Sequence, residues 1–168
     1  AIPLRENWTL PNNFAKRVNK ARSQLTCIVN PHAPSGFLLS IEDLSELAAE
    51  IEGVLLIDEA YVDFVDPTLD HRSTELVHAF DNVLLLRSLS KGYSLAGLRF
   101  GFLLGNPQLL QPIATKTRDS YNKDSLGQHL ACAAFEDDDY ARATWELVRG
   151  SRQDLREALV ALGFQVPV

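Results

Sequence analysis

Four short runs of apolar residues, separated by longer polar or amphipathic stretches, constrain the fold of this chain most strongly. The runs are rich in Val, Ile and Leu and cover Leu25 to Val29, Val54 to Ile57, Val83 to Leu86 and Phe100 to Leu104. Each run is too short and too apolar to form a surface helix, so we predict four strands. Buried strands that alternate with helices are typical of a mostly parallel sheet flanked by helices, and we assign the chain to the α/β class.

The stretches between and after these runs carry helix signals. Ser40 precedes two acidic residues and then apolar residues at helical spacing, which predicts an N-capped amphipathic helix. Asn106 comes directly before a proline, the pattern of a second helix start. Two more helices are expected at about Ser125 to Phe135 and at Tyr140 to Leu162, the second ending at Gly163.

Length and composition exclude several classes of protein. The chain has 168 residues, of which 46% are hydrophobic and 23% charged, so we expect one domain with its own core rather than a disordered protein. A formal net charge of -6 provides no broad basic face, and nucleic acid is therefore not an expected partner. No run approaches the roughly 18 apolar residues that a membrane span needs, so we expect no membrane association.

Cys27 and Cys132 are the two cysteines of the chain. They are too few and too far apart for a disulfide scaffold or a zinc site, and no metal is expected. Cys27 lies in an apolar run, where we expect it to pack as a small hydrophobic residue. This cysteine usage fits a reducing compartment and predicts a cytoplasmic protein.

Polar residues follow directly after three of the predicted strands, the position where open α/β sheets bind ligands. The first run leads to Asn30 and a turn with two prolines and Gly36, which serves a structural turn as readily as a site. The second run leads to Asp58, Glu59 and Tyr61. A carboxylate at the edge of an apolar sheet needs a partner, although Asp58 by itself could be a helix cap or a surface acid. Glu59 is expected to be structural.

The third run leads into a loop that gathers hydroxyl, amine and guanidinium groups among three glycines. The residues with these groups are Ser88, Ser90, Lys91 and Arg99. Glycines allow close backbone approach, and serine hydroxyls and arginine are the groups that hold a phosphate. A lone lysine is usually a solvated surface charge, but Lys91 follows an apolar strand among phosphate ligands, which favours a chemical role.

These three segments together indicate a ligand with a phosphate, a group that pairs with a carboxylate, and a carbon that condenses with an amine. Pyridoxal 5'-phosphate (PLP) has all three. Its pyridine nitrogen pairs with a carboxylate, its ring oxygen accepts from a phenol, and its aldehyde forms a Schiff base with a lysine.

The three segments also resemble one known family. Their motifs, N-P-x-x-P-S-G, then D-E-A-Y, then S-L-S-K-x-x-x-L-A-G-L-R-x-G-F, are similar in order and spacing to those of fold type I aminotransferases, and most of all to the histidinol-phosphate aminotransferase family. The resemblance implies a PLP-dependent transfer of an amino group between histidinol phosphate, or a similar amino compound, and 2-oxoglutarate. It also implies a homodimer that works in amino-acid biosynthesis, namely that of histidine.

Carried over by motif position, the resemblance implies a role for each candidate residue. Lys91 would be the catalytic Schiff-base lysine and proton carrier. Asp58 would pair with the pyridine nitrogen, while Asn30 and Tyr61 would hydrogen-bond the ring oxygen. The implied ligands of the cofactor phosphate are Ser88, Ser90 and Arg99.

The resemblance further implies a longer protein than this chain. Residues 1–139 would form part of the PLP-binding large domain, and residues 140–168 an interdomain helix and the start of a small C-terminal domain. The family's N-terminal phosphate-binding turn, its ring-stacking aromatic residue, the tyrosine of the dimer partner and the substrate-binding arginine are not visible here. We therefore expect a chain truncated at both ends, which should not transaminate unaided.

Three other interpretations stay open. Threonine-phosphate decarboxylases resemble the same family and share its PLP motifs, although the L-A-G-L-R-F-G-F run favours the aminotransferase. Ser88 and Lys91 also fit the S-x-x-K motif of acyl-serine hydrolases, with Ser120 to Asn122 as S-x-N, but the K-T-G element of that family is missing. Finally, the chain could be a non-catalytic piece that pairs with the rest of its enzyme.

Overall fold

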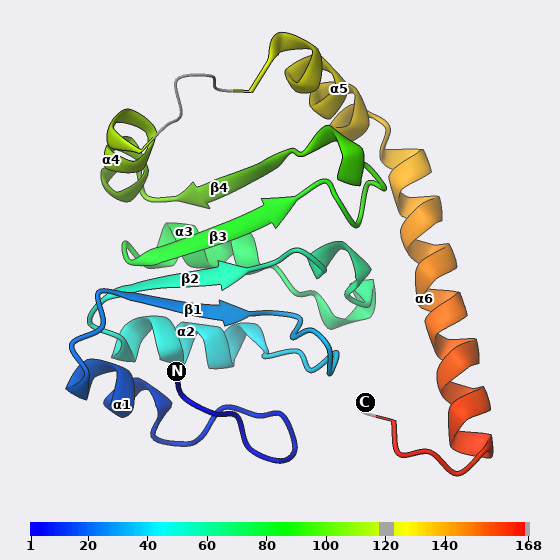
Figure 1. The fold of residues 1–168 in the computed structure, drawn as a ribbon, viewed down its shortest axis with the longest axis horizontal. Coiled ribbons are helices and arrows are strands. Elements are labelled where there is room, and N and C mark those ends of the chain that lie inside the picture. The colour runs from blue at the N-terminus through cyan, green and yellow to red at the C-terminus, as the bar shows by residue number, and fades with distance from the viewer. Residues whose placement is uncertain (118–122, 167–168) are drawn as a thin grey trace.

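A computed structural model of the chain describes residues 1–117 and 123–166, and within them the strands form one sheet (Figure 1). The strands are β1 (Leu25–Val29), β2 (Val54–Asp58), β3 (Val83–Ser88) and β4 (Gly101–Gly105). Their order in the sheet is β1-β2-β3-β4, with β1, β2 and β3 parallel and β4 antiparallel to β3. The predicted α/β class and mostly parallel sheet are confirmed, and each strand lies within two residues of its predicted ends.

Helices separate or follow these strands. They are α1 (Phe14–Lys20), α2 (Ile41–Glu50), α3 (Leu76–Ala79), α4 (Pro107–Lys116), α5 (Ser125–Glu136) and α6 (Asp138–Ala161). The four predicted helices are present as α2, α4, α5 and α6, and the structure adds α1 and α3, which the sequence signals did not predict. Short 3-10 turns lie at Val62–Phe64, Pro67–Leu69, Ser73–Glu75 and Ala96–Leu98. Asn106 caps α4 by accepting from the N–H of Gln108, and Gly163, with a φ of 85°, follows the end of α6. The predicted helix ends are thereby confirmed.

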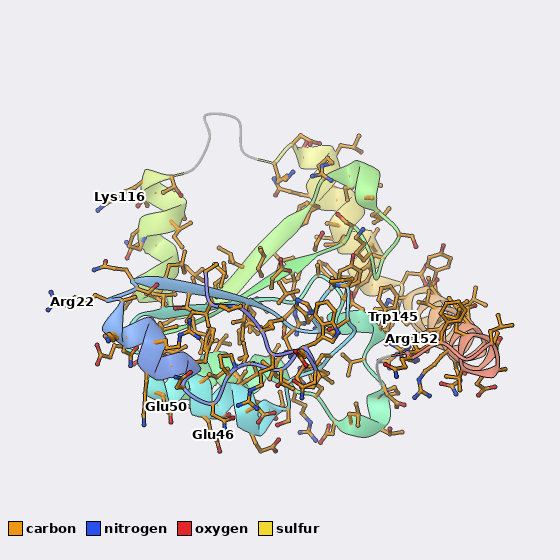
Figure 2. All side chains as sticks on the ribbon, turned by 60° about the horizontal axis from the view of Figure 1, so that its bottom comes forward. Arg22, Glu46, Glu50, Lys116, Trp145 and Arg152 are labelled. Carbon is orange, nitrogen blue, oxygen red and sulfur yellow. The ribbon has the colours of Figure 1, made fainter. Side chains whose placement is uncertain are left out.

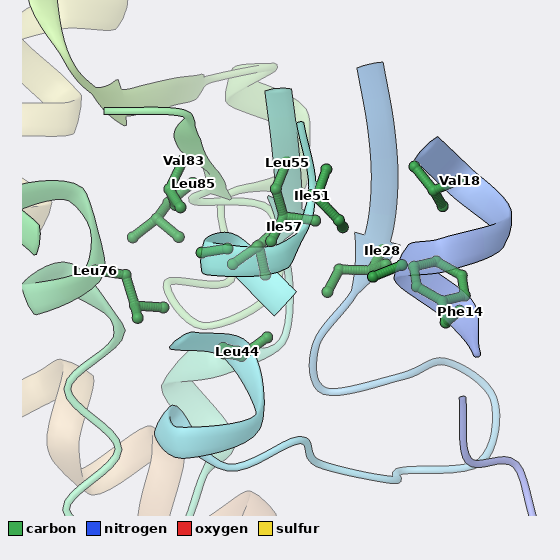
Figure 3. Close-up of a cluster of buried hydrophobic side chains, with 12 residues drawn as sticks. Phe14, Val18, Ile28, Leu44, Ile51, Leu55, Ile57, Leu76, Val83 and Leu85 are labelled. Atoms are coloured by element: carbon green, nitrogen blue, oxygen red, sulfur yellow. The ribbon is translucent and has the colours of Figure 1, made fainter. Parts of the chain in front are cut away.

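The core lies on one face of the sheet, which α1, α2 and α3 cover. Figure 3 shows Phe14 and Val18 of α1 beside Ile28 of β1, and Leu44 of α2 below the strands. On β2, every second side chain is fully buried, at Leu55 and Ile57, because alternate residues of a strand point to opposite faces. The helix-covered face is thus the hydrophobic centre of the domain.

The opposite face of the edge strand β1 is exposed. Leu25 and Val29 are 53% and 37% exposed, and Cys27 between them is exposed as well. The expectation that Cys27 packs as a buried hydrophobic residue is therefore wrong for this structure. Its strand is apolar on both faces, but the described helices cover only the face to which Thr26 and Ile28 point.

A buried ion pair joins the ends of β2 and β3 on the covered face. Glu59, whose side chain is fully buried, accepts a hydrogen bond from Nε of Arg87 at 2.7 Å. The same guanidinium donates to the hydroxyl of Ser73 at 3.2 Å. A buried carboxylate is stable only with such partners, so the structural role expected for Glu59 is confirmed.

Asp63 adds a second acid to this cluster. Burial raises the pKa of the Asp63 carboxyl from its ordinary 3.8 to about 6, with Arg87 lowering it and Glu59 raising it further. Its carboxylate lies against Gly92, where an added Cβ would stand only 2.0 Å from Oδ2. Asp63 therefore packs directly against the loop that follows β3.

The long helix α6 passes the loops at the carboxyl ends of β2 and β3 (Figure 1). No helix within residues 1–117 and 123–166 is both long and apolar enough to cross a membrane.

Replacing Ser40 with alanine should destabilise the protein through the start of α2. Ser40 accepts from the N–H of Asp43 at 3.1 Å, and the Asp43 carboxylate accepts from the N–H of Ser40 at 3.1 Å. We expect Ser40→Ala to lower the free energy of unfolding by about 1 kcal/mol in urea denaturation. Ser45→Ala, which removes a hydroxyl bonded to Ile41 O in the same helix, should cost about 0.5 kcal/mol or less. Equal losses in both variants would contradict the capping box.

Replacing Asp63 with asparagine should change how stability depends on pH. Because the folded-state pKa of Asp63 lies above its ordinary value, folding stability falls as the pH rises from about 4 to about 6. Asp63→Asn removes this loss, so we expect the variant to be more stable than the parent at about pH 7 and no more stable below about pH 4. Urea denaturation at a series of pH values measures the difference.

Asp66→Asn is the matched control, since hydrogen bonds from Thr68 lower the pKa of Asp66. Its effect should have the opposite sign, a loss of stability at neutral pH that disappears in acid. Parallel pH profiles for the parent and Asp63→Asn would show that Asp63 titrates normally.

Candidate functional site

The candidate site lies at the carboxyl ends of β2 and β3, on the face opposite the core. Asp58 is the last residue of β2 and stands opposite Leu86 of β3 in the parallel register. Ser88, two residues further, ends β3 and points to the same face as Leu86, because side chains alternate along a strand. The register of the two parallel strands therefore turns Asp58 and Ser88 to the same face of the sheet.

Asp58 and Tyr61 are held by the turn that leaves β2. The Asp58 carboxylate accepts from the N–H of Ala60 at 3.0 Å, and Tyr61 opens the 3-10 turn Val62–Phe64. The ammonium of Lys91 lies 5.7 Å from the centre of the Tyr61 ring, within the range of a cation–π contact. Residues 30 positions apart in the sequence therefore meet at this edge of the sheet.

Ser88 and Ser90 form a pair of hydroxyls at the start of the Lys91 loop, which we define as residues 89–95. The Ser88 hydroxyl donates to Oγ of Ser90 at 2.8 Å and accepts from the N–H of Ser90 at 3.0 Å. Both side chains are half-buried, so this arrangement presents two hydroxyls at one partly enclosed point. Neighbouring hydroxyls and a backbone turn of this kind suit an anion.

Backbone hydrogen bonds fix the rest of the loop. The N–H of Ser94 donates to the carbonyl of Lys91 at 3.1 Å, and that of Leu95 to the carbonyl of Leu89 at 3.0 Å. Ser94 has a φ of 56°, in the left-handed region that a non-glycine residue rarely adopts. The side chain of Lys91 is exposed at the top of this turn. The loop therefore holds its backbone in place and leaves the amine accessible.

The turn that carries Arg99 lies beside Ser88. The carbonyl of Phe100 accepts from the N–H of Leu89 at 3.1 Å and lies 3.4 Å from the hydroxyl oxygen of Ser88. Arg99 itself is exposed, has a φ of 55°, and donates to the carbonyl of Ala96 at 3.4 Å. A hydrogen bond of that length is weak, so an anion could compete for the guanidinium.

Asn30 lies at the same sheet edge, since its N–H donates to the carbonyl of Asp58 at 2.9 Å, but its side chain does not join this group. Its side chain is fully buried, with Oδ1 accepting from the N–H of Leu39 at 2.7 Å and Nδ2 donating to the carbonyl of Leu39 at 3.3 Å. Asn30 continues the alternation of Thr26 and Ile28, and so points to the helix-covered face rather than to that of Asp58. Nδ2 also lies 3.5 Å from Nε2 of His71, so in this structure the amide holds the proline-containing loop and contacts groups on the covered side of the sheet.

Two residues that touch the Lys91 loop were missed by the sequence reasoning. Asp63 packs against Gly92, and the indole Nε1 of Trp145 donates to the carbonyl of Gly92 at 2.6 Å. Asp63 lies close to the D-E-A-Y motif, and an acid in an otherwise apolar segment was a usable signal. Trp145 lies 53 residues beyond Gly92, and nothing in the local pattern points to it.

The acyl-serine hydrolase interpretation loses support from the position of Ser88. In that family the serine opens a helix, whereas Ser88 is the last residue of a strand and its hydroxyl is bonded to Ser90. The proposed S-x-N element, Ser120 to Asn122, lies outside the described residues.

Comparison with known proteins gives one consistent result. The family model "Aminotransferase class I and II" matches residues 7–167. Histidinol-phosphate aminotransferase 1 from Trichormus variabilis is 44% identical over 165 residues, and the enzyme of the same name from Nostoc is 46% identical. These alignments cover 98% of this chain but 45% and 44% of the two relatives.

The fold comparison agrees. The crystal structure of histidinol-phosphate aminotransferase from Sinorhizobium meliloti in complex with pyridoxal-5'-phosphate matches with a TM-score of 0.87 and 25% identity. This match covers 97% of this chain and 44% of that one, so the chain spans less than half the length of the proteins it resembles. A family model that matches nearly all of the chain shows that it belongs to the class I and II aminotransferase family.

Proposed function

We propose that this chain carries the cofactor-binding centre of a PLP-dependent aminotransferase, with Lys91 as the Schiff-base lysine. The observation that carries the proposal is the meeting of Asp58, Tyr61 and Lys91 at one edge of the sheet, beside the hydroxyl pair of Ser88 and Ser90. Family membership and the PLP complex of the Sinorhizobium relative support it.

The residues present fit this cofactor by their chemistry. A carboxylate, two hydroxyls, a guanidinium and an accessible amine are the groups that PLP requires. The carboxylate, the two hydroxyls and the amine lie at or just beyond the ends of two adjacent parallel strands. The guanidinium belongs to Arg99, which lies on the turn that contacts Ser88. Bound PLP would supply an aldehyde carbon that condenses with amino compounds and a ring that withdraws electrons from them.

Each residue then has a defined task. Asp58 would keep a proton on the pyridine nitrogen, and Tyr61 would donate to the ring oxygen. Lys91 would hold the cofactor through Nζ and, once released, move protons at the substrate carbon from its position beside Tyr61. The proposed ligands of the phosphate are Ser88, Ser90 and Arg99. Asn30 is left out because Leu39 occupies its amide.

The names of the relatives guide the proposed reaction. They support histidinol phosphate, or a similar amino compound, as the amino donor, in the biosynthesis of histidine. We propose 2-oxoglutarate as the amino acceptor and the cytoplasm as the compartment. We further propose that residues 1–139 belong to the PLP-binding domain, that α6 leads to a second domain, and that the enzyme is a homodimer. Large apolar side chains are exposed on α6, at Leu147 (70%) and Leu155 (61%), and directly after it, at Leu162 (74%), which supports further contacts there.

Incubation with PLP followed by borohydride reduction should attach the cofactor to Lys91. The amine is accessible and stands among the proposed phosphate and ring ligands, so peptide mass spectrometry should find the modification there. Lys91→Ala should abolish it, and Lys116→Ala, which removes an exposed lysine at the end of α4, should leave it unchanged. Modification spread over many lysines, or none in a folded protein, would refute Lys91 as the cofactor lysine.

Substrate tests separate the aminotransferase from the decarboxylase. With histidinol phosphate, we expect the absorbance of the lysine-bound cofactor to be lost without release of CO₂, and to return when 2-oxoglutarate is added. The full-length enzyme is the proper sample because this chain spans less than half the length of the relatives it matches. Release of CO₂ from threonine phosphate, with no amino transfer from histidinol phosphate, would decide for a decarboxylase.

A further inference from the structure

We propose that Trp145 of α6 is a positioning residue for the Lys91 loop. Its indole N–H donates to the carbonyl of Gly92 at 2.6 Å, and Gly92 directly follows Lys91. The inference rests on the proposed function of Lys91 and goes beyond it, because it assigns a part of the site to a helix that carries none of the motifs.

The contact is built into its surroundings. Gly92 is buried, so its carbonyl oxygen has little access to water, and Trp145 is only partly exposed. A buried carbonyl without a hydrogen bond is costly, and the indole N–H is a donor only, so the two groups suit each other. The rings of Tyr93 and Trp145 meet edge to face, with centres 5.7 Å apart and an interplanar angle of 88°.

The aromatic contacts extend to α5 and β4. Tyr93 also meets Phe135 of α5 at 5.2 Å and 76°, and Phe135 meets Phe102 of β4 at 5.6 Å and 80°. Edge-to-face pairs of this kind stabilise a defined ring orientation. The indole of Trp145 therefore has a fixed direction in which to present its N–H to the loop.

The carboxylate of Asp63 packs against Gly92 as well. An added Cβ at Gly92 would stand 2.0 Å from Oδ2 of Asp63, whereas the carbonyl of Gly92 is bonded to Trp145. The backbone beside Lys91 is thus fixed by two groups from distant parts of the chain. A shift of that backbone would move Lys91 Nζ relative to Tyr61.

α6 contacts the loop after β2 as well. Arg152, about two turns beyond Trp145 on α6, donates to the carbonyl of Phe64 at 3.3 Å, at the end of the 3-10 turn that follows Tyr61 (Figure 2). One rigid helix therefore holds the loops of both Tyr61 and Lys91. The hydrogen bond from Trp145 is shorter than that from Arg152, and the Trp145 side chain is less exposed. We therefore assign the larger effect to Trp145.

Trp145→Phe tests the proposal because it keeps an aromatic ring and removes the N–H donor. Without cofactor, the amides of Ser94 and Leu95 should exchange with deuterium about fivefold faster, the equivalent of one ordinary hydrogen bond. With PLP, the concentration that half-modifies Lys91 should rise by about the same factor. The matched control is Trp8→Phe, since Trp8 is the other tryptophan and is 42% exposed in the N-terminal segment.

The outcomes are distinct. Unchanged exchange and unchanged modification of Lys91 in Trp145→Phe would overturn the proposal and leave the proposed function intact, because packing alone would then explain Trp145. Absence of Lys91 modification in the parent protein would refute the proposed function, and the exchange rates would still decide whether Trp145 orders the loop. A change of equal size in Trp8→Phe would also overturn the proposal.

Discussion

The buried ion pair between Glu59 and Arg87 is the interaction on which the site depends. Glu59 directly follows Asp58, and Arg87 directly precedes Ser88, so the pair fixes the ends of β2 and β3 from the covered side of the sheet. Because a buried carboxylate without a partner is costly, the burial of Glu59 favours the strand register that places Arg87 beside it. Because alternate residues face opposite sides, the same register turns Asp58 and Ser88 to the other face.

This division of the sheet separates structural polar groups from chemical ones. Asn30, Glu59 and Arg87 lie on the helix-covered side, where Asn30 bonds to Leu39 and Arg87 donates to one carboxylate oxygen of Glu59. Asp58 and Lys91 lie at the accessible edge, where the Lys91 loop is braced by groups on the 3-10 turn after β2 and on α6. The Lys91 amine is thus accessible, while α6 and the turn after β2 hold the backbone of its loop in place.

Much of the fold follows from local patterns in the sequence. β1 has its predicted bounds, and the N-cap at Ser40 and the left-handed Gly163 after α6 are confirmed, because each depends on residues a few positions apart. Cys27 was misplaced because burial of a strand face depends on which helices cover it. Asn30 and Trp145 show the same limit for the site: motif order identifies residues near a ligand, but the face they point to and their distant partners arise only in three dimensions.

A crystal structure of the protein with PLP tests the central claim most directly, namely that the face of Asp58 and Ser88 is the cofactor face. The account predicts electron density continuous with Nζ of Lys91, with the ring nitrogen facing the Asp58 carboxylate and the phosphate beside the hydroxyls of Ser88 and Ser90. Asn30 should remain bonded to Leu39. Cofactor density on the covered side of the sheet, or a ring held by Asn30 and away from Asp58, would contradict it.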